Sequence, residues 1–317
     1  MNDLVIEGFQ YPENPAWSLQ PDEIQGMLDR INGARRMWPL LAAMRPFVPL
    51  LRDVMCGFVE EQNGRPVGLI NYGRQHDTPD WYIFNVTVLP EYRRRGIARR
   101  LVEATLDELR RREARSAVLD VVAGNDPAFN LYRELGFEAF AQSVQYHLQP
   151  NAAPGAGAPP HGYRFHRLRS LDWRTPYGFA RSVTPERVTR YEPVIEARFR
   201  SPALMVLAIN LFLALGGSRS ERFALYTEDD QVAAVGQYGY RTRSTGTNSA
   251  QLAIDPRHPD LAGFVLRHTF WAVSTASPGL RIELAFDDYQ TALIEQAEAL
   301  GCQKRYALDR MGLRLSP

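Results

Sequence analysis

The sequence predicts an α/β protein made of two similar halves, each a mixed, twisted sheet flanked by helices. In the first half, three strand-like segments precede an alternation of helix-like and strand-like segments, an order typical of helices packed on the faces of a mixed sheet. A run of Pro, Gly and Ala without periodicity, Pro150–Gly162, lies near the middle of the chain and is typical of a linker. Similar short motifs recur in the same order on both sides of this linker, which indicates an internal repeat.

The elements of the first half follow from hydrophobic periodicity and from turn residues. The expected strands are Leu4–Phe9, Met55–Glu61, Pro66–Gln75, Trp81–Leu89, Ala117–Val122 and Gln142–Leu148. The expected helices are Pro21–Asn32, Arg35–Leu51, Gly96–Ala114 and Pro127–Leu135. The dipeptide Asn63-Gly64, between the second and third strands, predicts a hairpin.

The internal repeat is visible in two pairs of segments. Asn85–Pro90 resembles Gln251–Pro256 at an offset of 251 − 85 = 166 residues. Glu134–Phe137 resembles Ala299–Cys302 at an offset of 299 − 134 = 165 residues. Because order and spacing recur together, we expect the second half to repeat the fold of the first. The alternative is that any two α/β units would look this similar.

Length and composition limit the possible classes of function. A chain of 317 residues favours two domains. The net charge of +1 argues against nucleic acid as a partner, which requires an unbalanced basic surface. The two cysteines, Cys56 and Cys302, lie far apart in the sequence, so we expect neither a disulfide framework nor a metal site.

The most apolar run, Pro202–Leu215, is shorter than the roughly 18 to 20 residues that span a bilayer. We therefore expect a buried helix at this position and no membrane as a partner. The first residues show no basic segment followed by an apolar one, so a cytoplasmic location is expected.

The segment Val86–Ala98 predicts an anion-binding loop between a strand and a helix. Pro90 cannot donate a ladder hydrogen bond and therefore ends the strand. The start of the following helix presents unpaired backbone N–H groups, which suit a phosphate or pyrophosphate. Gly96 and Ala98 carry little or no side chain, so a ligand can approach the backbone closely. The alternative for Arg93–Arg95 is a solvated, charged face.

Two motifs in this part of the chain carry a family resemblance. Arg93–Ala98 matches the pattern [Q/R]-x-x-G-x-[G/A], and Asn125–Phe137 resembles N-x-x-A-x-x-L-Y-x-x-x-G-F. One helix and one strand separate the two motifs. Val86–Phe137 thus resembles the core of the Gcn5-related N-acetyltransferase (GNAT) superfamily. The resemblance implies an enzyme that transfers the acetyl group of acetyl-CoA to a primary amine by direct attack, without a metal.

The resemblance also implies roles for individual residues. The expected coenzyme A contacts lie on one strand, one loop and two helix starts: Val86, Thr87, Val88, Arg93, Arg94, Arg95, Gly96, Ile97, Ala98, Arg99 and Asn125. Tyr132 matches the tyrosine that protonates the leaving thiolate. Asp120 lies where some relatives place a carboxylate that deprotonates the amine, as the chemistry requires. The backbone N–H of Val88 is the expected oxyanion donor.

Each of these roles has an alternative. Tyr132 has the helical spacing of a core aromatic residue, and Asp120 has the alternation of a plain surface carboxylate on a strand. Asn125 precedes Asp126-Pro127 and is also a good turn or helix-cap residue. Lesser candidates for the base lie on or near the neighbouring strands: Glu60, Glu61, His76 and Asp80.

The second half is expected to be a degenerate copy. After Pro256 the sequence R-H-P-D-L-A-G matches no coenzyme loop. At an offset of 165 the position of Tyr132 is Ala297, which has no proton to donate. We therefore expect a catalytic domain in residues 1–149 and a degenerate domain in residues 163–317 that packs on the first or shapes the acceptor site.

The expected acceptor is a small-molecule amine or a peptide, and the expected protein is a monomer or a homodimer. An alternative function is a non-enzymatic sensor or scaffold that binds acyl-CoA. A partner-binding protein with two vestigial sites is a third reading, which the intact Arg93–Ala98 loop argues against.

Overall fold

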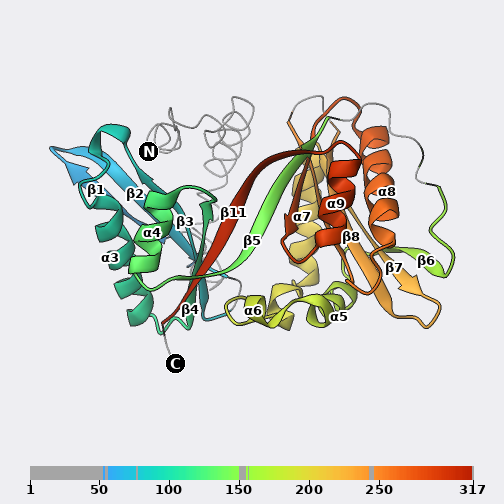
Figure 1. The fold of residues 1–317 in the computed structure, drawn as a ribbon, viewed down its shortest axis with the longest axis horizontal. Helices are drawn as coiled ribbons and strands as arrows, with labels where there is room; N and C mark the ends of the chain where they lie inside the picture. Colours follow the sequence, from blue (N-terminus) through green and yellow to red (C-terminus); the bar gives the residue numbers. More distant parts are fainter. Residues whose placement is uncertain are drawn as a thin grey trace. The chain divides into compact units, whose positions relative to one another are not determined.

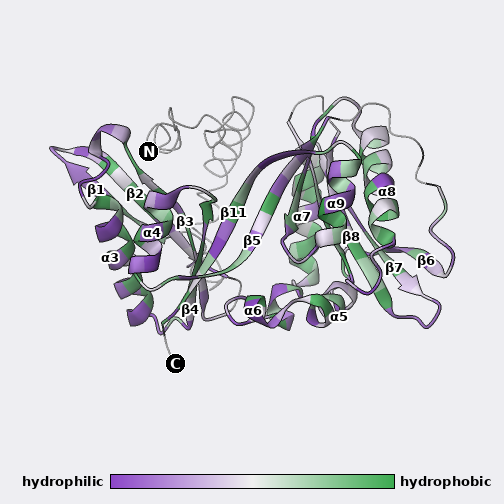
Figure 2. Ribbon diagram, viewed as in Figure 1, coloured by the Kyte–Doolittle hydropathy of each residue, from purple (hydrophilic) through white to green (hydrophobic). Residues whose placement is uncertain are grey.

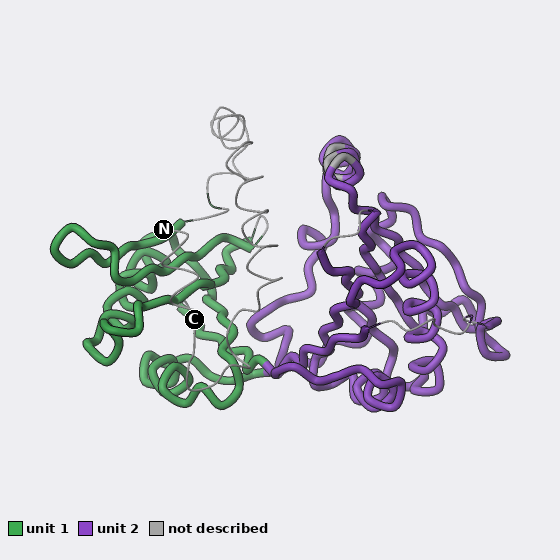
Figure 3. The backbone as a smooth tube through the Cα atoms, turned by 90° about the horizontal axis from the view of Figure 1, so that it is seen from above, with its two compact units in different colours: residues 1–140, 308–317 green, residues 141–307 purple. Residues whose placement is uncertain are grey.

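The computed structural model describes residues 53, 56–75, 78–149, 155, 157–242 and 246–315. The strand and two helices expected before residue 52 lie outside the described residues, as does His76. The chain forms two compact units, residues 1–140 with 308–317 and residues 141–307 (Figure 3). We call them unit 1 and unit 2.

The described residues of unit 1 form five neighbouring strands of a mixed sheet, with helices α3 and α4 packed on one face (Figure 1). The strand order is β1-β2-β3-β4-β11, antiparallel except for the parallel pair β3–β4. The elements are β1 (Cys56–Gln62), β2 (Arg65–Arg74), β3 (Asp80–Val88), η3 (Pro90–Tyr92), α3 (Ile97–Arg111), β4 (Ser116–Val122), α4 (Asp126–Glu134) and the C-terminal part of β11 (Gln303–Arg314).

The predicted hairpin is confirmed. Gln62 faces Arg65 across it, and Asn63 and Gly64 both have positive φ, 53° and 75°. These values belong to a type I′ turn, whose twist matches that of the strands.

Helix α3 packs closely on the sheet of unit 1. A Cβ at Gly68 would lie 2.7 Å from Ile97 Cγ2, so glycine is required on β2 for this approach. Ile97, Leu101 and Leu109 are buried, while the charged residues of α3 face outward (Figure 2). The predicted amphipathic helix is thus confirmed.

Unit 2 contains strands in the order β5-β10-β9-β8-β7-β6. Its strands are β5 (Glu138–Leu148, from Ala141), β6 (Tyr163–Leu168), β7 (Ser218–Thr227), β8 (Val232–Arg241), β9 (Asn248–Ile254) and β10 (Ile282–Asp287). Its helices are α5 (Arg174–Val183), α6 (Glu186–Thr189), η4 (Glu196–Arg198), α7 (Ala203–Leu215), α8 (Leu261–Ala276) and α9 (Thr291–Ala299).

The predicted repeat of the fold is confirmed, and equivalent helices in the two halves are preceded by the same backbone hydrogen bond. Helices α4 and α9 start at residues 126 and 291, an offset of 165. The N–H of Asn125 donates to Val122 O at 2.9 Å, and the N–H of Gln290 donates to Asp287 O at 2.9 Å. Asn125 and Gln290 therefore occupy equivalent positions before equivalent helices.

The last strand of each sequence half belongs to the unit formed mainly by the other half. The chain enters unit 2 within β5 and returns to unit 1 within β11. In unit 2, β5 pairs with β10 over Ser143–Leu148; in unit 1, β11 pairs with β4 over Leu308–Arg314. The expected linker, residues 150–162, joins β5 to β6 within unit 2. Each compact unit is thus completed by a strand from the other half.

Helix α7 forms where the apolar run predicts a helix, but the expectation that it is buried is wrong. Leu204, Leu207 and Leu211 are 79%, 66% and 60% exposed. Most residues of α7 are nonetheless hydrophobic (Figure 2). Across the described ranges, no helix is both long and apolar enough to cross a membrane.

Candidate functional site

Strands β3 and β4 of unit 1 separate beside the predicted coenzyme-binding strand. Their parallel pairing ends where Ile83 faces Leu119, although both strands continue. At the same point β3 contains one extra residue relative to β2, and Asn85 has a φ of 53°. Such a β-bulge bends the strand. The predicted residues Val86–Val88 therefore lie on a stretch of β3 that is paired only with β2.

The predicted loop and helix start at Gly96 are confirmed. Leu89 N–H donates to Val67 O at 3.0 Å and ends β3, and η3 follows directly. Gly96, at φ 75°, precedes Ile97, the first residue of α3. The first turn of α3 contains no acidic residue, and no side chain caps it. The helix start thus combines unpaired N–H groups with the positive end of the helix dipole.

Two arginines of the loop donate hydrogen bonds to backbone carbonyl groups. Arg93 Nε donates to Val88 O at 3.3 Å, and Arg95 Nη2 donates to Glu91 O at 2.8 Å. Arg99 is half-buried and pairs with Glu134. Arg94 and Arg95 are exposed, as an anion-binding loop and a solvated face both require.

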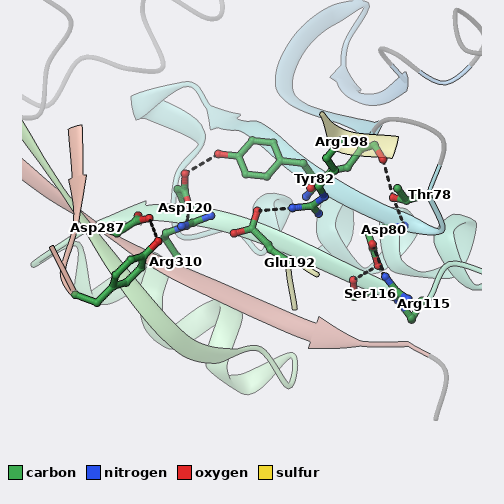
Figure 4. A network of polar contacts seen from close by, with 12 residues as sticks. Thr78, Asp80, Tyr82, Arg115, Ser116, Asp120, Glu192, Arg198, Asp287 and Arg310 are labelled. Atoms are coloured by element: carbon green, nitrogen blue, oxygen red, sulfur yellow. Dashed lines mark hydrogen bonds and ion pairs between the residues drawn. The ribbon is translucent and has the colours of Figure 1, made fainter. Parts of the chain in front are cut away.

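Asp120 lies between two polar side chains, on the face of the sheet opposite α3 and α4 (Figure 4). Tyr82 of β3 donates from its hydroxyl to Asp120 Oδ2 at 2.8 Å. Arg310 of β11 directly faces Asp120, with Nε 3.9 Å from Oδ1. Only 25% of the Asp120 side chain is exposed, so it is not a plain surface carboxylate.

Burial controls the protonation of this group of residues. It raises the pKa of the Asp120 carboxyl, although the hydrogen bond from Tyr82 and the charge of Arg310 oppose the rise. It also raises the pKa of the Tyr82 phenol, which the neighbouring Asp120 raises further. Desolvation lowers the pKa of the Arg310 guanidinium, which lies 5.4 Å from the centre of the Phe140 ring. A carboxylate with a raised pKa is suited to accept a proton near neutral pH.

Neither Tyr82 nor Arg310 was predicted from the sequence. Arg310 lies 310 − 120 = 190 residues from Asp120 and reaches it only because β11 joins unit 1. The available signal was an arginine beside the apolar residues Met311 and Leu313 in the last strand.

Asn125 and Tyr132 occupy opposite ends of α4. Asn125 is the N-cap, and its Oδ1 accepts from Ala128 N–H at 3.3 Å, so the expected cap role is confirmed. Tyr132 is only 6% exposed and contacts Phe137 edge-on, with ring centres 6.0 Å apart. This burial is what the core-aromatic alternative predicts. Its role as an acid stays a prediction.

Tyr132 and Asp120 lie on opposite faces of β4. Tyr132 belongs to the core cluster that contains Leu119 and Val121. Asp120 lies between these two residues on the strand and therefore points the other way. A ligand bound between the separated strands would pass between the two predicted catalytic residues.

Two of the lesser candidates for the base, Asp80 and Glu60, have structural partners. Asp80 is fully buried and accepts from Arg115 Nε at 2.9 Å and from Ser116 Oγ at 2.8 Å (Figure 4). Glu60 pairs with Arg100 at 2.6 Å. Within the described part of the chain, no three His, Cys, Asp or Glu side chains gather as metal ligands.

Unit 2 has a different structure at the equivalent place. Asp255 N–H donates to Ala233 O, as Leu89 does to Val67 in unit 1, so Ile254 is equivalent to Val88. Gln290 Oε1 accepts from Ile254 N–H at 2.9 Å, and Gln290 Nε2 donates to Ile254 O at 3.2 Å. The strand-edge groups of Ile254 are therefore occupied by a buried side chain.

The loop that follows in unit 2 contains an ion pair. Arg257 donates to both carboxylate oxygens of Asp255, at 2.6 Å for Nη2 to Oδ2. This ion pair lowers the pKa of Asp255. A buried carboxylate stands at the end of β9, where unit 1 has Leu89 and an arginine-rich loop.

Known proteins resemble the first half in sequence. Residues 27–137 match the model of the Acetyltransferase (GNAT) family. N-alpha-acetyltransferase 30 of Schizosaccharomyces pombe is 36% identical over 67 residues, 21% of this chain and 45% of the relative. The ribosomal protein bS18-alanine N-acetyltransferase of Escherichia coli is 44% identical over 55 residues, 17% of this chain and 37% of the relative. The chain therefore spans less than half the length of these curated relatives.

Solved structures resemble the fold over most of the chain. A GCN5-related N-acetyltransferase from Sphaerobacter thermophilus aligns with a TM-score of 0.58 and 15% identity, over 80% of this chain and 79% of that one. A tandem GNAT protein from the clavulanic acid biosynthesis pathway aligns with a TM-score of 0.54 and 16% identity, over 83% of this chain and 84% of that one. The fold of the chain thus resembles that of a tandem GNAT protein, and residues 27–137 match the model of the acetyltransferase (GNAT) family.

Proposed function

We propose that the chain is an acetyl-CoA-dependent N-acetyltransferase whose active site lies in unit 1. The observation that carries this proposal is the difference between the two units at equivalent positions. In unit 1 the strands separate beside a glycine-led helix start. In unit 2 a buried glutamine and an Asp–Arg ion pair fill the same region.

The loop of unit 1 fits the pyrophosphate of coenzyme A. Gly96 adopts the left-handed conformation that turns the chain into α3 and adds no side chain to the cradle. The N–H groups of Ile97 and Ala98 would bind the phosphate oxygens. The edge of β3 at Val86–Val88 and the amide of Asn125 would hold the pantetheine arm by hydrogen bonds.

The chemistry follows from the two residues on either side of β4. Acetyl-CoA supplies the acetyl thioester. Asp120 accepts the proton of the amine, because its raised pKa brings it closer to that of the donor. The N–H of Val88 stabilises the negative charge on the carbonyl oxygen, and the hydroxyl of Tyr132 protonates the leaving thiolate.

The acceptor is proposed to be a primary amine of a small molecule or a peptide. The names of two relatives refer to N-alpha-acetylation and to an alanine of ribosomal protein bS18, which favours testing peptides first. The burial of Tyr132 favours a second candidate, a sensor that binds acyl-CoA without turnover.

Release of coenzyme A from acetyl-CoA tests this proposal. The purified chain should be assayed with a panel of peptides of different N-terminal residues and with small primary amines. Release that depends on one acceptor class supports the enzyme. Saturable binding of acetyl-CoA without release on any acceptor supports the sensor instead, and no binding contradicts both.

A further inference from the structure

Unit 2 contains a cavity of about 470 Å³, a volume within the range of small-molecule sites. It lies over strands β7, β8 and β9, with residues of α5, η4 and α7 at its borders. Its floor is a row of three polar side chains in register: Arg222 faces Gln237, and Gln237 faces Gln251.

This polar row is unusual for its place in the sheet. The neighbours of Arg222 and Gln251 along their strands, Phe223 and Leu252, belong to the buried core on the α8 side. The row therefore points to the opposite face. Gln237 and Gln251 are exposed although β8 and β9 are interior strands. Their side chains line the open cavity.

Arg222 gives the cavity a charge that is not neutralised. The side chain is half-buried, and Nη1 donates to the backbone O of Ser170 at 3.3 Å. Among the residues that the structure describes, no carboxylate lies within ion-pair distance of it; Asp172 acts only from farther away. Burial lowers the pKa of the Arg222 guanidinium, which reflects the cost of removing its charge from water.

The other arginine of the cavity differs in this respect. Arg198 lies 4.0 Å from Glu192, so its charge has a counter-ion. The walls include the rings of Trp173 and Phe199. The cavity thus combines one uncompensated cation, two amides and two aromatic walls.

We propose that unit 2 binds a small organic carboxylate with an aromatic or flat apolar body. Its carboxylate pairs with Arg222, for which a planar guanidinium is well suited. Gln237, which faces Arg222 across the strands, donates a further hydrogen bond to the carboxylate, and Trp173 and Phe199 enclose the apolar body. This site is separate from the proposed coenzyme site, because it belongs to the unit whose coenzyme region is closed by Gln290.

Calorimetric titration of the full chain with 3-phenylpropionate tests the proposal, with 3-phenylpropanol as the uncharged control ligand. We expect saturable binding of the acid and at least about tenfold weaker binding of the alcohol, since a charge-assisted hydrogen bond is lost. Arg222→Gln should weaken binding of the acid by about tenfold or more. Arg164→Gln, which removes an exposed arginine of unit 2 paired with Asp230, should leave it unchanged.

Three outcomes would overturn the proposal. The first is no saturable binding of the acid to the unaltered chain. The second is equal binding of acid and alcohol. The third is undiminished binding by Arg222→Gln, which would place the anion elsewhere, for example at the loop of unit 1. Gln237→Leu serves as a second variant if Arg222→Gln does not fold, and it should also weaken binding because it removes an amide from the floor.

Discussion

Asp120 is the residue whose protonation the proposed reaction depends on most. Burial raises the pKa of Asp120. The ionised carboxylate that accepts a proton therefore forms at a higher pH than for an ordinary aspartate. We expect kcat/KM to fall as the pH drops through this raised pKa. Asp120→Asn should remove that limb of the pH profile and lower the rate by roughly 10²- to 10⁴-fold.

The matched control for this variant is Asp107→Asn, which removes an exposed carboxylate of α3 paired with Arg110. It should leave the pH profile intact. A profile of Asp120→Asn that keeps the acidic limb would show that another group is the base.

The same raised pKa makes a prediction for stability. A carboxyl whose pKa is higher in the folded state than in the unfolded state favours folding in its protonated form. That contribution is complete below the unfolded pKa and is lost as the pH rises through the folded pKa. At neutral pH, Asp120→Asn should therefore be at least as stable as the unaltered protein in urea unfolding. A clear loss of stability would show that the ionised carboxylate is favoured by Tyr82 and Arg310.

Tyr132 has two readings that one variant separates. Tyr132→Phe keeps the ring that contacts Phe137 and removes only the hydroxyl. If the hydroxyl protonates the leaving thiolate, kcat should fall by about tenfold or more while KM for acetyl-CoA stays the same. If Tyr132 is only a core residue, kcat will not change. Steady-state kinetics with Phe129→Leu as a control for altered packing of α4 distinguishes the two.

At the scale of single elements, the helix start at Gly96 makes the sharpest prediction. Gly96 and Gly64 both have a φ of 75°, so replacing either by alanine introduces a similar backbone strain of about 1–2 kcal/mol. Only Gly96 lies in the proposed pyrophosphate cradle. Gly96→Ala should weaken binding of coenzyme A, whereas Gly64→Ala in the β1–β2 hairpin should lower stability to a similar extent without changing affinity. Equal affinities of the two variants for coenzyme A would show that the loop at Gly96 is not part of the binding site.

Local patterns predict the elements of unit 1 from β1 to α4 to within a few residues. The alternation of two in strands, the period of 3.6 in α3 and the turn at Asn63-Gly64 each depend on residues close in the sequence. The pairing of β5 and β11 does not. The residue pattern of each strand is compatible with pairing in either unit. The choice between partners depends on packing between residues far apart in the sequence.

The candidate site divides in the same way. The helix start at Gly96 and the cap role of Asn125 are local features, and the sequence indicates both. Tyr82 and Arg310 contact Asp120 from two other strands. A single sequence does not show which residues of neighbouring strands face each other. The pKa of Asp120 is raised by its burial in the assembled sheet, against the effects of Tyr82 and Arg310, so it could not be predicted either.

At the scale of the whole molecule, the two units share a fold and differ in the region that would bind coenzyme A. Gln290 is one methylene longer than its equivalent Asn125 and satisfies both backbone groups of Ile254. In unit 1, Asn125 caps α4 instead. A side chain thus occupies both the N–H and the carbonyl of Ile254 in unit 2, whereas in unit 1 Arg93 donates to the carbonyl of Val88. The carboxylate cavity proposed for unit 2 gives the second copy a different use.

The number of coenzyme A molecules bound per chain tests the central claim most directly. Calorimetric titration of the full chain with acetyl-CoA should give one site. Gly96→Glu should abolish it by placing a carboxylate in the phosphate cradle, and Gln290→Ala in unit 2 should leave it in place. Two sites in the unaltered chain, or one site that survives Gly96→Glu and is lost in Gln290→Ala, would contradict an active site in unit 1.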